Sequence, residues 1–387
     1  MGLTFDVGII GAGIQGAGVA QAAAAAGYSV VVWEQTGIAS GTSSRSSKLI
    51  HGGLRYLENG QFSLVRKSLE ERALLFKNAP ALVKPVPFYI PIYPTTTRRP
   101  WKVRIGLSLY ALLGYLSRYA RYKNIRNRYL AERDGLVTDG LQCLFQYWDG
   151  QTDDLALTSA VMQSAQSLGA RFYCPSLVLS IKRADEAYQV VVIQGGKQVT
   201  FTCKTLVNAA GPWVNQVIDR VQSAATKLEV DLVQGTHIVV DDKPPSGIYY
   251  VEAPQDQRAV FVMPWKGKTM IGTTESEFKG NNPAEVKPYQ EEIDYLLEVY
   301  QHYFPKRKGE LLESFAGLRV LPKQGNSFFN RPRDTVIYSD PNMPGLLTLY
   351  GGKLTGYRAT AEEVIQSLHK ILPEKNRVAD TKALGLQ

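Results

Sequence analysis

The chain opens with a short apolar run, a glycine-rich turn and a stretch of small apolar residues. Phe5–Ile10 is typical of a buried strand, Ile14–Ala26 of an alanine-rich helix, and Ser29–Glu34 of a second strand. A strand, a helix and a second strand in this order predict a βαβ unit with parallel strands. We therefore expect an α/β fold that begins with a Rossmann-like domain.

Further along the chain, helical and extended patterns alternate. Amphipathic patterns predict helices over Phe62–Asn78 and Tyr289–Phe304, and a last helix over Gly356–Leu372. Asp154 is expected to cap a helix that ends at Leu168, before Gly169. Alternating or continuous apolar positions predict strands at 178–181, 189–193 and 205–208, and a succession of strands over 227–274.

A chain of 387 residues is long enough for two or three domains. The nucleotide-binding pattern at the start, the block of strands in the middle and the strand–turn–helix at the end predict a discontinuous first domain. We expect it to contain residues 1–82, 134–226 and 328–387. The inserted domain, with a mixed or antiparallel β-sheet, is expected to contain residues 83–133 and 227–327.

The formal net charge of +9 is concentrated in one segment. Nine basic residues and no acidic residue lie between Arg98 and Leu130, whereas the rest of the chain holds 35 basic and 35 acidic residues. The segment also contains the apolar run Ile105–Leu116, which is shorter than the ~20 residues that span a bilayer.

Three interpretations of this basic segment are open. An apolar helix face beside lysine, arginine and tyrosine side chains suits the surface of an anionic membrane. A nucleic-acid groove also combines basic and aromatic side chains, and an ordinary buried helix with a solvated basic tail is the simplest alternative. Because no nucleic-acid-binding motif accompanies the segment, we expect a peripheral membrane contact and no nucleic-acid partner.

Three glycines follow the first predicted strand in GxGxxG spacing. Gly11 permits a tight turn, Gly13 lets the backbone approach a pyrophosphate, and Gly16 lets helix and strand pack closely. Glu34, at the end of the second strand, is placed to accept hydrogen bonds from both ribose hydroxyls of an adenosine. The pattern predicts a dinucleotide cofactor but does not separate FAD from NAD.

Seven sequence segments indicate a particular family. In chain order they are SSKLIHGGLRYLE (46–58), TLVNAAGPW (205–213), QGTHIVV (234–240), MPWKGKTMIGTTE (263–275), FAGLRVL (315–321), RPRDTVI (331–337) and LYGGKLTGYR (349–358). In order and spacing these segments resemble those of the FAD-dependent, aerobic glycerol-3-phosphate dehydrogenases, within the D-amino-acid-oxidase-like flavoprotein superfamily. The resemblance extends from Asp6 to the last helix.

The resemblance implies FAD as cofactor and oxidation of sn-glycerol 3-phosphate to dihydroxyacetone phosphate, with hydride transfer from carbon 2 to flavin N5. It further implies that electrons pass to a membrane quinone and that the protein is cytoplasmic and peripheral on the inner face of the cytoplasmic membrane. A homodimer is compatible with it.

Three features depart from the family pattern. Family members carry a further carboxy-terminal helical domain, which we expect to be absent because the chain stops soon after Leu372. The family's GTTD is GTTE at 272–275, and SGVRPL is AGLRVL at 316–321. The first departure bears on oligomerisation and quinone handling, and the other two leave room for a shifted substrate.

Flavin chemistry and the family motifs together indicate the cofactor residues. Accepting a hydride leaves electron density on the N1–C2=O edge of the flavin, which backbone amides at a helix start and an ammonium group can stabilise. We assign this role to residues 351–355, with Lys353 as the cation. The expected cofactor-binding residues are Gly11, Gly13, Gly16, Glu34, Ser46, Ser47, Lys48, Gly211, Gly352, Lys353, Leu354 and Thr355.

A phosphate monoester requires fork-shaped cationic donors. By resemblance, Arg319 and Arg333 would hold the phosphate, Arg55 and Tyr56 would flank the reacting end, and Glu275 is a further substrate-binding candidate.

Proton abstraction from the substrate hydroxyl requires a base, and an ordinary pKa near 6.5 suits histidine to this role. His51 and His237 are the candidate bases, with Glu275 as a third. The expected catalytic residues are thus His51, His237, Arg55 and Lys353, and no spacing indicates a metal site.

Other functions stay open at this point. A flavin oxidase of the same superfamily acting on an amino or hydroxy acid needs one arginine for a carboxylate. A flavin-bound RNA-binding or RNA-modifying protein would use the basic segment, and a family member lacking the helical domain could keep FAD without turnover. The sequence does not decide which base acts, whether His51 bears a covalent flavin, or whether quinone or O₂ is the electron acceptor.

Overall fold

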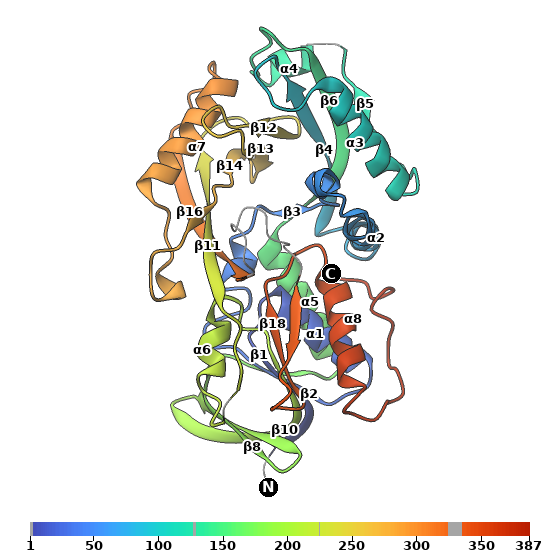
Figure 1. Ribbon diagram of the computed structural model, residues 1–387, viewed down its shortest axis with the longest axis vertical. Coiled ribbons are helices and arrows are strands. Elements are labelled where there is room, and N and C mark those ends of the chain that lie inside the picture. Colours follow the sequence, from blue (N-terminus) through green and yellow to red (C-terminus); the bar gives the residue numbers. More distant parts are fainter. Residues whose placement is uncertain (1–2, 127–128, 224, 324–334) are drawn as a thin grey trace.

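The computed structural model describes residues 3–126, 129–223, 225–323 and 335–387. Two mixed β-sheets follow one another along the long axis of the molecule, and each is flanked by helices (Figure 1).

The first sheet contains the predicted βαβ unit. Its central strand β1 (Leu3–Ile10) lies between β2 (Val30–Trp33) and β10 (Lys197–Asn208) and is parallel to both. Such a strand is covered on both faces, which explains its continuous apolar sequence. The other strands of this sheet are β7 (Arg171–Tyr173), β8 (Ser176–Ala184), β9 (Ala187–Gln194), β17 (Val336–Ser339) and β18 (Leu346–Tyr350).

Helix α1 (Ile14–Ala25) is buried along its whole length. It packs against α5 (Asp154–Ser167) and α8 (Tyr357–Leu368), and its alanines share one hydrophobic core with both helices. Small side chains suit this position because they let two neighbouring helices and the sheet approach closely. The short α6 (Val214–Ile218) follows β10.

The second sheet is antiparallel except where β12 pairs with β4. Its strands are β3 (Leu49–Ile50), β4 (Val83–Ile92), β5 (Lys123–Asn124), β6 (Cys143–Thr152), β11 (Val230–Val240), β12 (Ile248–Glu252), β13 (Ala259–Trp265), β14 (Lys268–Gly272), β15 (Ser276–Glu277) and β16 (Leu311–Pro322). Its helices are α2 (Phe62–Asn78), α3 (Pro100–Leu113), α4 (Tyr129–Arg133) and α7 (Gln290–Tyr303).

Strands of the first sheet come from three separate parts of the chain, and those of the second come from the parts between them. The predicted fold class, a discontinuous Rossmann-like domain with an inserted mixed sheet, is confirmed. The exact domain bounds stay a prediction. Strand β6, which lies within the range 134–226 assigned to the first domain, hydrogen-bonds to β4 of the second sheet.

Helix α2 begins and ends where the sequence predicted, but the start of α5 differs. The cap is Asp153, whose carboxylate accepts hydrogen bonds from the backbone of Leu155 and Ala156. Asp154 is instead the first helical residue and forms an ion pair with Lys48. The prediction of Asp154 as the cap was wrong because two adjacent aspartates are equivalent in the local pattern, and only a partner distant in sequence distinguishes them.

Helix α3 contains residues 105–113 of the apolar run in the basic segment and has two apolar faces. Val103, Leu107 and Tyr110 pack into the core of the second sheet. The opposite face leaves Trp101 60% and Ile105 59% exposed. Within the described part of the chain, no helix combines the length and the apolar character needed to cross a membrane.

Candidate functional site

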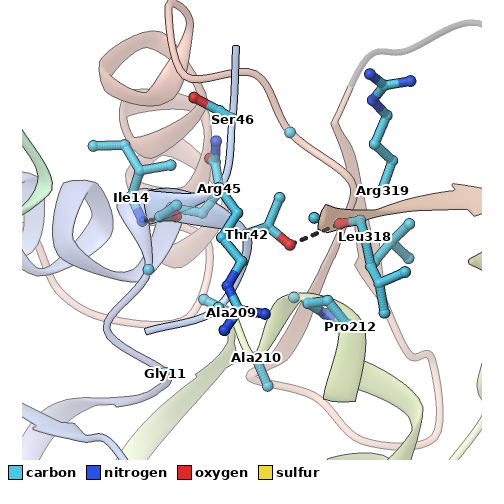
Figure 2. Close-up of a pocket in the computed structure, with 18 of the residues that line it drawn as sticks. Gly11, Ile14, Thr42, Arg45, Ser46, Ala209, Ala210, Pro212, Leu318 and Arg319 are labelled. Carbon is cyan, nitrogen blue, oxygen red and sulfur yellow. Dashed lines mark hydrogen bonds between the residues drawn. The ribbon is translucent and has the colours of Figure 1, made fainter. Parts of the chain in front are cut away.

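A cavity of about 390 Å³ is lined by segments of both sheets. The turn after β1, the segment 40–56, the loop after β10, strand β16 and residues 351–355 all contribute to its wall. Figure 2 shows the part of the cavity where Gly11, Thr42, Ala209 and Leu318 meet.

The glycine turn forms a cradle that side chains would fill. Gly11 has a φ of +101°, and a Cβ on it would lie 2.7 Å from the carbonyl oxygen of Ala209. A Cβ on Gly16 would lie 2.0 Å from the carbonyl oxygen of Gly11. Close approach of backbone to ligand at a helix start is what a dinucleotide diphosphate requires, so these residues fit the cofactor predicted from the sequence.

Glu34 lines the cavity and also holds the glycine turn. Its carboxylate accepts hydrogen bonds from the backbone of Ala12, at 2.8 Å, and of Thr36, at 2.9 Å. Its position at the end of β2 is the one predicted. Its role toward a ribose remains a prediction.

Residues 351–355 lie between β18 and α8 and also line the cavity. Gly352 has a φ of +130°, and a Cβ there would lie 2.6 Å from Nε2 of Gln15. The Lys353 ammonium lies 4.3 Å from the centre of the Tyr56 ring, and Gln15 donates a hydrogen bond to the Lys353 carbonyl. The turn after β1 and the entry to α8 are therefore joined directly.

His51 lies at the boundary of the two sheets. It is half-buried, lines the cavity and donates its backbone N–H to Oγ1 of Thr355 at 3.1 Å. The structure thus brings together His51, Tyr56, Lys353, Leu354 and Thr355, which come from two separate sequence motifs. Gly13 and Gly211 line the same cavity.

The serine–lysine segment before His51 is fixed by a buried ion pair. Lys48 and Asp154 lie 2.6 Å apart, and both are buried. Ser46 donates both its backbone N–H and its hydroxyl to the same carboxylate. Ser46 lines the cavity, whereas Lys48 does not and lies behind its wall.

His237 is buried on β11 and lines the cavity. Its Nε2 lies 2.9 Å from Oγ of Ser47, and its ring stacks on Phe315. Burial lowers the pKa of His237 to about 3, and the nearby Arg319 and Lys48 shift it in the same direction. The imidazole is therefore neutral at pH 7.

The lowered pKa of His237 makes stability depend on pH. Below about pH 6.5 the unfolded chain binds a proton on this side chain that the folded chain does not bind. Stability should therefore rise between about pH 3 and pH 6.5 and gain nothing further above that range. His237→Gln should flatten this part of the profile, measured as unfolding free energy at several pH values. A profile as steep as that of the wild type would assign the dependence to other groups.

Only some of the predicted substrate-binding residues line the cavity. Arg319 lines the cavity and lies 3.4 Å from Oε1 of Glu275, which itself does not line it. Tyr56 lines the cavity, whereas Arg55 is exposed and is not among the lining residues. Arg333 lies outside the described residues.

Arg45 and Gln15 are among the lining residues that the sequence did not indicate. Arg45 directly precedes the first family segment, and Gln15 lies in the first turn of α1. The position of Arg45, a basic residue between the glycine motif and the first family segment, could have indicated an anion-binding role. No local sequence signal indicated Gln15, because its side-chain amide bonds to the carbonyl of Lys353, 338 positions away in the chain.

The glycine cradle and the cavity beside it are those of a dinucleotide-binding protein. Residues 6–358 match the family described as FAD dependent oxidoreductase (DAO), and the chain belongs to that family. FAD is its cofactor.

Several relatives are similar over most of the chain. The glycerol-3-phosphate dehydrogenase of Pseudomonas aeruginosa is 36% identical over 371 residues, 94% of this chain and 71% of that protein. The aerobic glycerol-3-phosphate dehydrogenase of Escherichia coli is 35% identical, over 94% of this chain and 73% of that protein. The D-erythritol 1-phosphate dehydrogenase of Brucella abortus is 35% identical, over 96% and 75%. The resemblance predicted from the seven segments is confirmed.

Solved structures of similar proteins have the same fold as this chain. The glycerol-3-phosphate dehydrogenase of Bacillus halodurans complexed with FAD has a TM-score of 0.77 at 28% identity, covering 99% of this chain and 68% of that chain. The L-alpha-glycerophosphate oxidase of Mycoplasma pneumoniae has the same TM-score at 18% identity, over 99% of each chain, which shows the shared fold.

Proposed function

We propose that the protein oxidises sn-glycerol 3-phosphate to dihydroxyacetone phosphate, with hydride transfer from carbon 2 to flavin N5. The observation that supports this most is the placement of Arg319 in the same cavity as His51 and residues 351–355. The names of relatives more than a third identical point to the same reaction.

Arg319 holds the phosphate in this proposal. Its guanidinium lies 3.4 Å from Oε1 of Glu275, and its side chain is 27% exposed. A phosphate with nearly two negative charges can accept forked, charge-assisted hydrogen bonds from a guanidinium. Arg333 would assist, and Arg55 and Tyr56 would lie at the reacting end, as expected from the resemblance.

His51 takes the proton of the substrate hydroxyl. His237 is a weaker proton acceptor at pH 7 because of its lowered pKa, and Glu275 contacts Arg319. His51 lines the cavity, and its backbone is anchored to Thr355. Bound FAD supplies the hydride acceptor. Lys353 and the amides ahead of α8 place positive charge at this end of the cavity.

Anaerobic addition of glycerol 3-phosphate tests the proposal. The substrate should reduce the bound flavin, which is measured as bleaching of its visible absorption band after mixing. D-erythritol 1-phosphate is the informative comparison, because one relative is named for it and GTTE replaces GTTD here. Absence of bleaching by any polyol phosphate, with bleaching by an amino or hydroxy acid, would assign the protein to the other oxidases of the superfamily.

Arg319→Ala should raise KM for glycerol 3-phosphate by about tenfold or more, because one charge-assisted contact to phosphate is lost. Steady-state turnover with a dye as electron acceptor measures this. Arg258→Ala is a matched control, since Arg258 lies near Glu275 but does not line the cavity. An unchanged KM would remove Arg319 from the phosphate site.

We propose further that α3 places the protein on an anionic membrane surface, where a quinone accepts the electrons. The exposed side chains Trp101, Ile105 and Leu112 form an apolar strip with Lys102 and Arg104 beside it. Apolar insertion combined with attraction of lysine and arginine to acidic lipids is the usual basis of such binding.

Flotation with vesicles containing acidic lipid tests the membrane contact. The protein should float with them at low salt and less at high salt, and Ile105→Ser with Leu112→Ser should reduce flotation several-fold. Leu311→Ser with Leu312→Ser is the control, because these leucines are also exposed but lie at the start of β16. Equal flotation of both double variants would contradict the assignment to α3.

A further inference from the structure

Four arginine and lysine side chains line the cavity, and three of them have contacts within the protein. Arg319 contacts Glu275, Arg220 donates to the carbonyl of Val178, and Lys353 packs over Tyr56. The fourth is Arg45. Its half-buried guanidinium has no ion-pair or hydrogen-bond partner among the residues that the structure describes.

The backbone at Arg45 is held firmly. Arg45 ends the short 3₁₀ helix η1 (Thr42–Ser44) and donates its N–H to Thr42 at 3.0 Å. Thr42 donates its hydroxyl to the carbonyl of Leu318 at 2.7 Å (Figure 2). A Cβ on Gly317 would lie 2.7 Å from the Arg45 carbonyl oxygen, so strand β16 packs directly against this residue.

The same turn also contacts the start of α1. The Ser43 hydroxyl accepts a hydrogen bond from the backbone of Ile14 at 2.9 Å. Figure 2 shows the Arg45 side chain pointing toward Ala209 and Ala210, and away from the side chain of Arg319. The carbonyl of Ala209 is the group that a Cβ on Gly11 would meet. The guanidinium is therefore directed toward the glycine cradle.

We propose that Arg45 binds the diphosphate of FAD. A diphosphate carries about two negative charges, and the glycine turn offers backbone amides but no cation. The first turn of α1 contains no charged residue, the Ile14 amide is already bonded to Ser43, and the buried Glu34 carboxylate adds negative charge nearby. A guanidinium held in the facing wall supplies the missing positive charge and can bind two oxygens at once.

The structure favours the cofactor over the substrate as the anion for Arg45. Arg319 and Arg45 lie on segments that touch, since Leu318 bonds to Thr42, but their side chains diverge in Figure 2. The proposal depends on FAD, the family's cofactor, and is independent of which polyol phosphate is oxidised.

Release of FAD from the holoenzyme tests the proposal. Holoenzyme is diluted, and free FAD is measured by its fluorescence to obtain Kd in wild type, Arg45→Gln and Arg45→Lys. Arg45→Gln should raise Kd about tenfold or more, and Arg45→Lys less, because lysine keeps the charge but not the fork. Kd should also respond less to salt in Arg45→Gln than in wild type.

Arg171→Gln is the matched control, because Arg171 is an exposed arginine on β7 of the same sheet and does not line the cavity. It should leave Kd for FAD unchanged. A Kd within about twofold of wild type in Arg45→Gln would overturn the proposal. So would a raised KM for glycerol 3-phosphate with unchanged FAD binding, which would assign Arg45 to the substrate. If circular dichroism shows that Arg45→Gln folds poorly, the test rests on two other measurements. These are the Kd for FAD of Arg45→Lys and the salt dependence of Kd in the wild type.

Discussion

Gly16→Ala is expected to yield protein that retains little or no FAD after purification. The added methyl carbon would lie 2.0 Å from the carbonyl oxygen of Gly11, a backbone atom that cannot rotate away. Relief requires α1 to move away from β1 or the turn to open, and either change displaces the backbone that approaches the diphosphate. Overpacking of this kind costs about 1–3 kcal/mol even without a ligand. The ratio of flavin absorbance to protein absorbance measures the retained cofactor.

Gly106→Ala is the control for the loss of a glycine as such. A Cβ there meets no atom within 4 Å, and the residue lies within α3. Alanine in a helix is favoured over glycine, so this variant should be more stable by about 0.5–1 kcal/mol and should keep its FAD. A Gly16→Ala protein with full flavin content would show that α1 does not depend on close contact with the turn.

Asp149→Ala should lower the unfolding free energy by about 3–5 kcal/mol, the largest change expected from a single truncation here. Asp149 forms an ion pair with Arg72, and their side chains are 1% and 3% exposed. It also accepts hydrogen bonds from the Tyr110 hydroxyl, at 2.7 Å, and from the backbone of Gly52, at 3.2 Å. Its removal leaves a buried guanidinium without a counter-charge. Denaturant titration monitored by circular dichroism gives the free energy.

Asp219→Ala provides the matched comparison. Asp219 and Lys227 form an ion pair on the surface, with side chains 58% and 49% exposed, so the loss should be at most about 1 kcal/mol. Similar losses in the two variants would contradict a buried, uncompensated charge as the cause. Gly52 directly follows His51, and Asp149→Ala should therefore also lower turnover at temperatures where the variant remains folded.

The parts of the fold that sequence could predict are those determined by neighbouring residues. The helical period of Phe62–Asn78 and the apolar run of β1 are both local patterns. Helix α2 has the predicted bounds, and β1 ends where predicted but begins two residues earlier, at Leu3. The glycine cradle was predictable for the same reason, since the required backbone geometry restricts the residue type within one turn.

The remainder depends on contacts between distant segments. Lys48 was expected to face the cofactor, but its ammonium pairs with Asp154, 106 positions later in the chain. Arg45 and Arg55 lie ten positions apart in the chain. Arg45, which no sequence motif indicated, lines the cavity, whereas Arg55, which was expected at the substrate, is exposed and does not line it. No local pattern indicates which of two nearby arginines will face strand β16.

The hydrogen bond between His51 and Thr355 spans 304 positions of the chain, and that between Gln15 and Lys353 spans 338. A growing polypeptide therefore presents the glycine turn long before the opposite wall of the binding cavity has been synthesised. We therefore expect flavin to bind late, after nearly the whole chain has been synthesised. Until then the incomplete nucleotide-binding domain is expected to expose apolar surface that the finished fold buries.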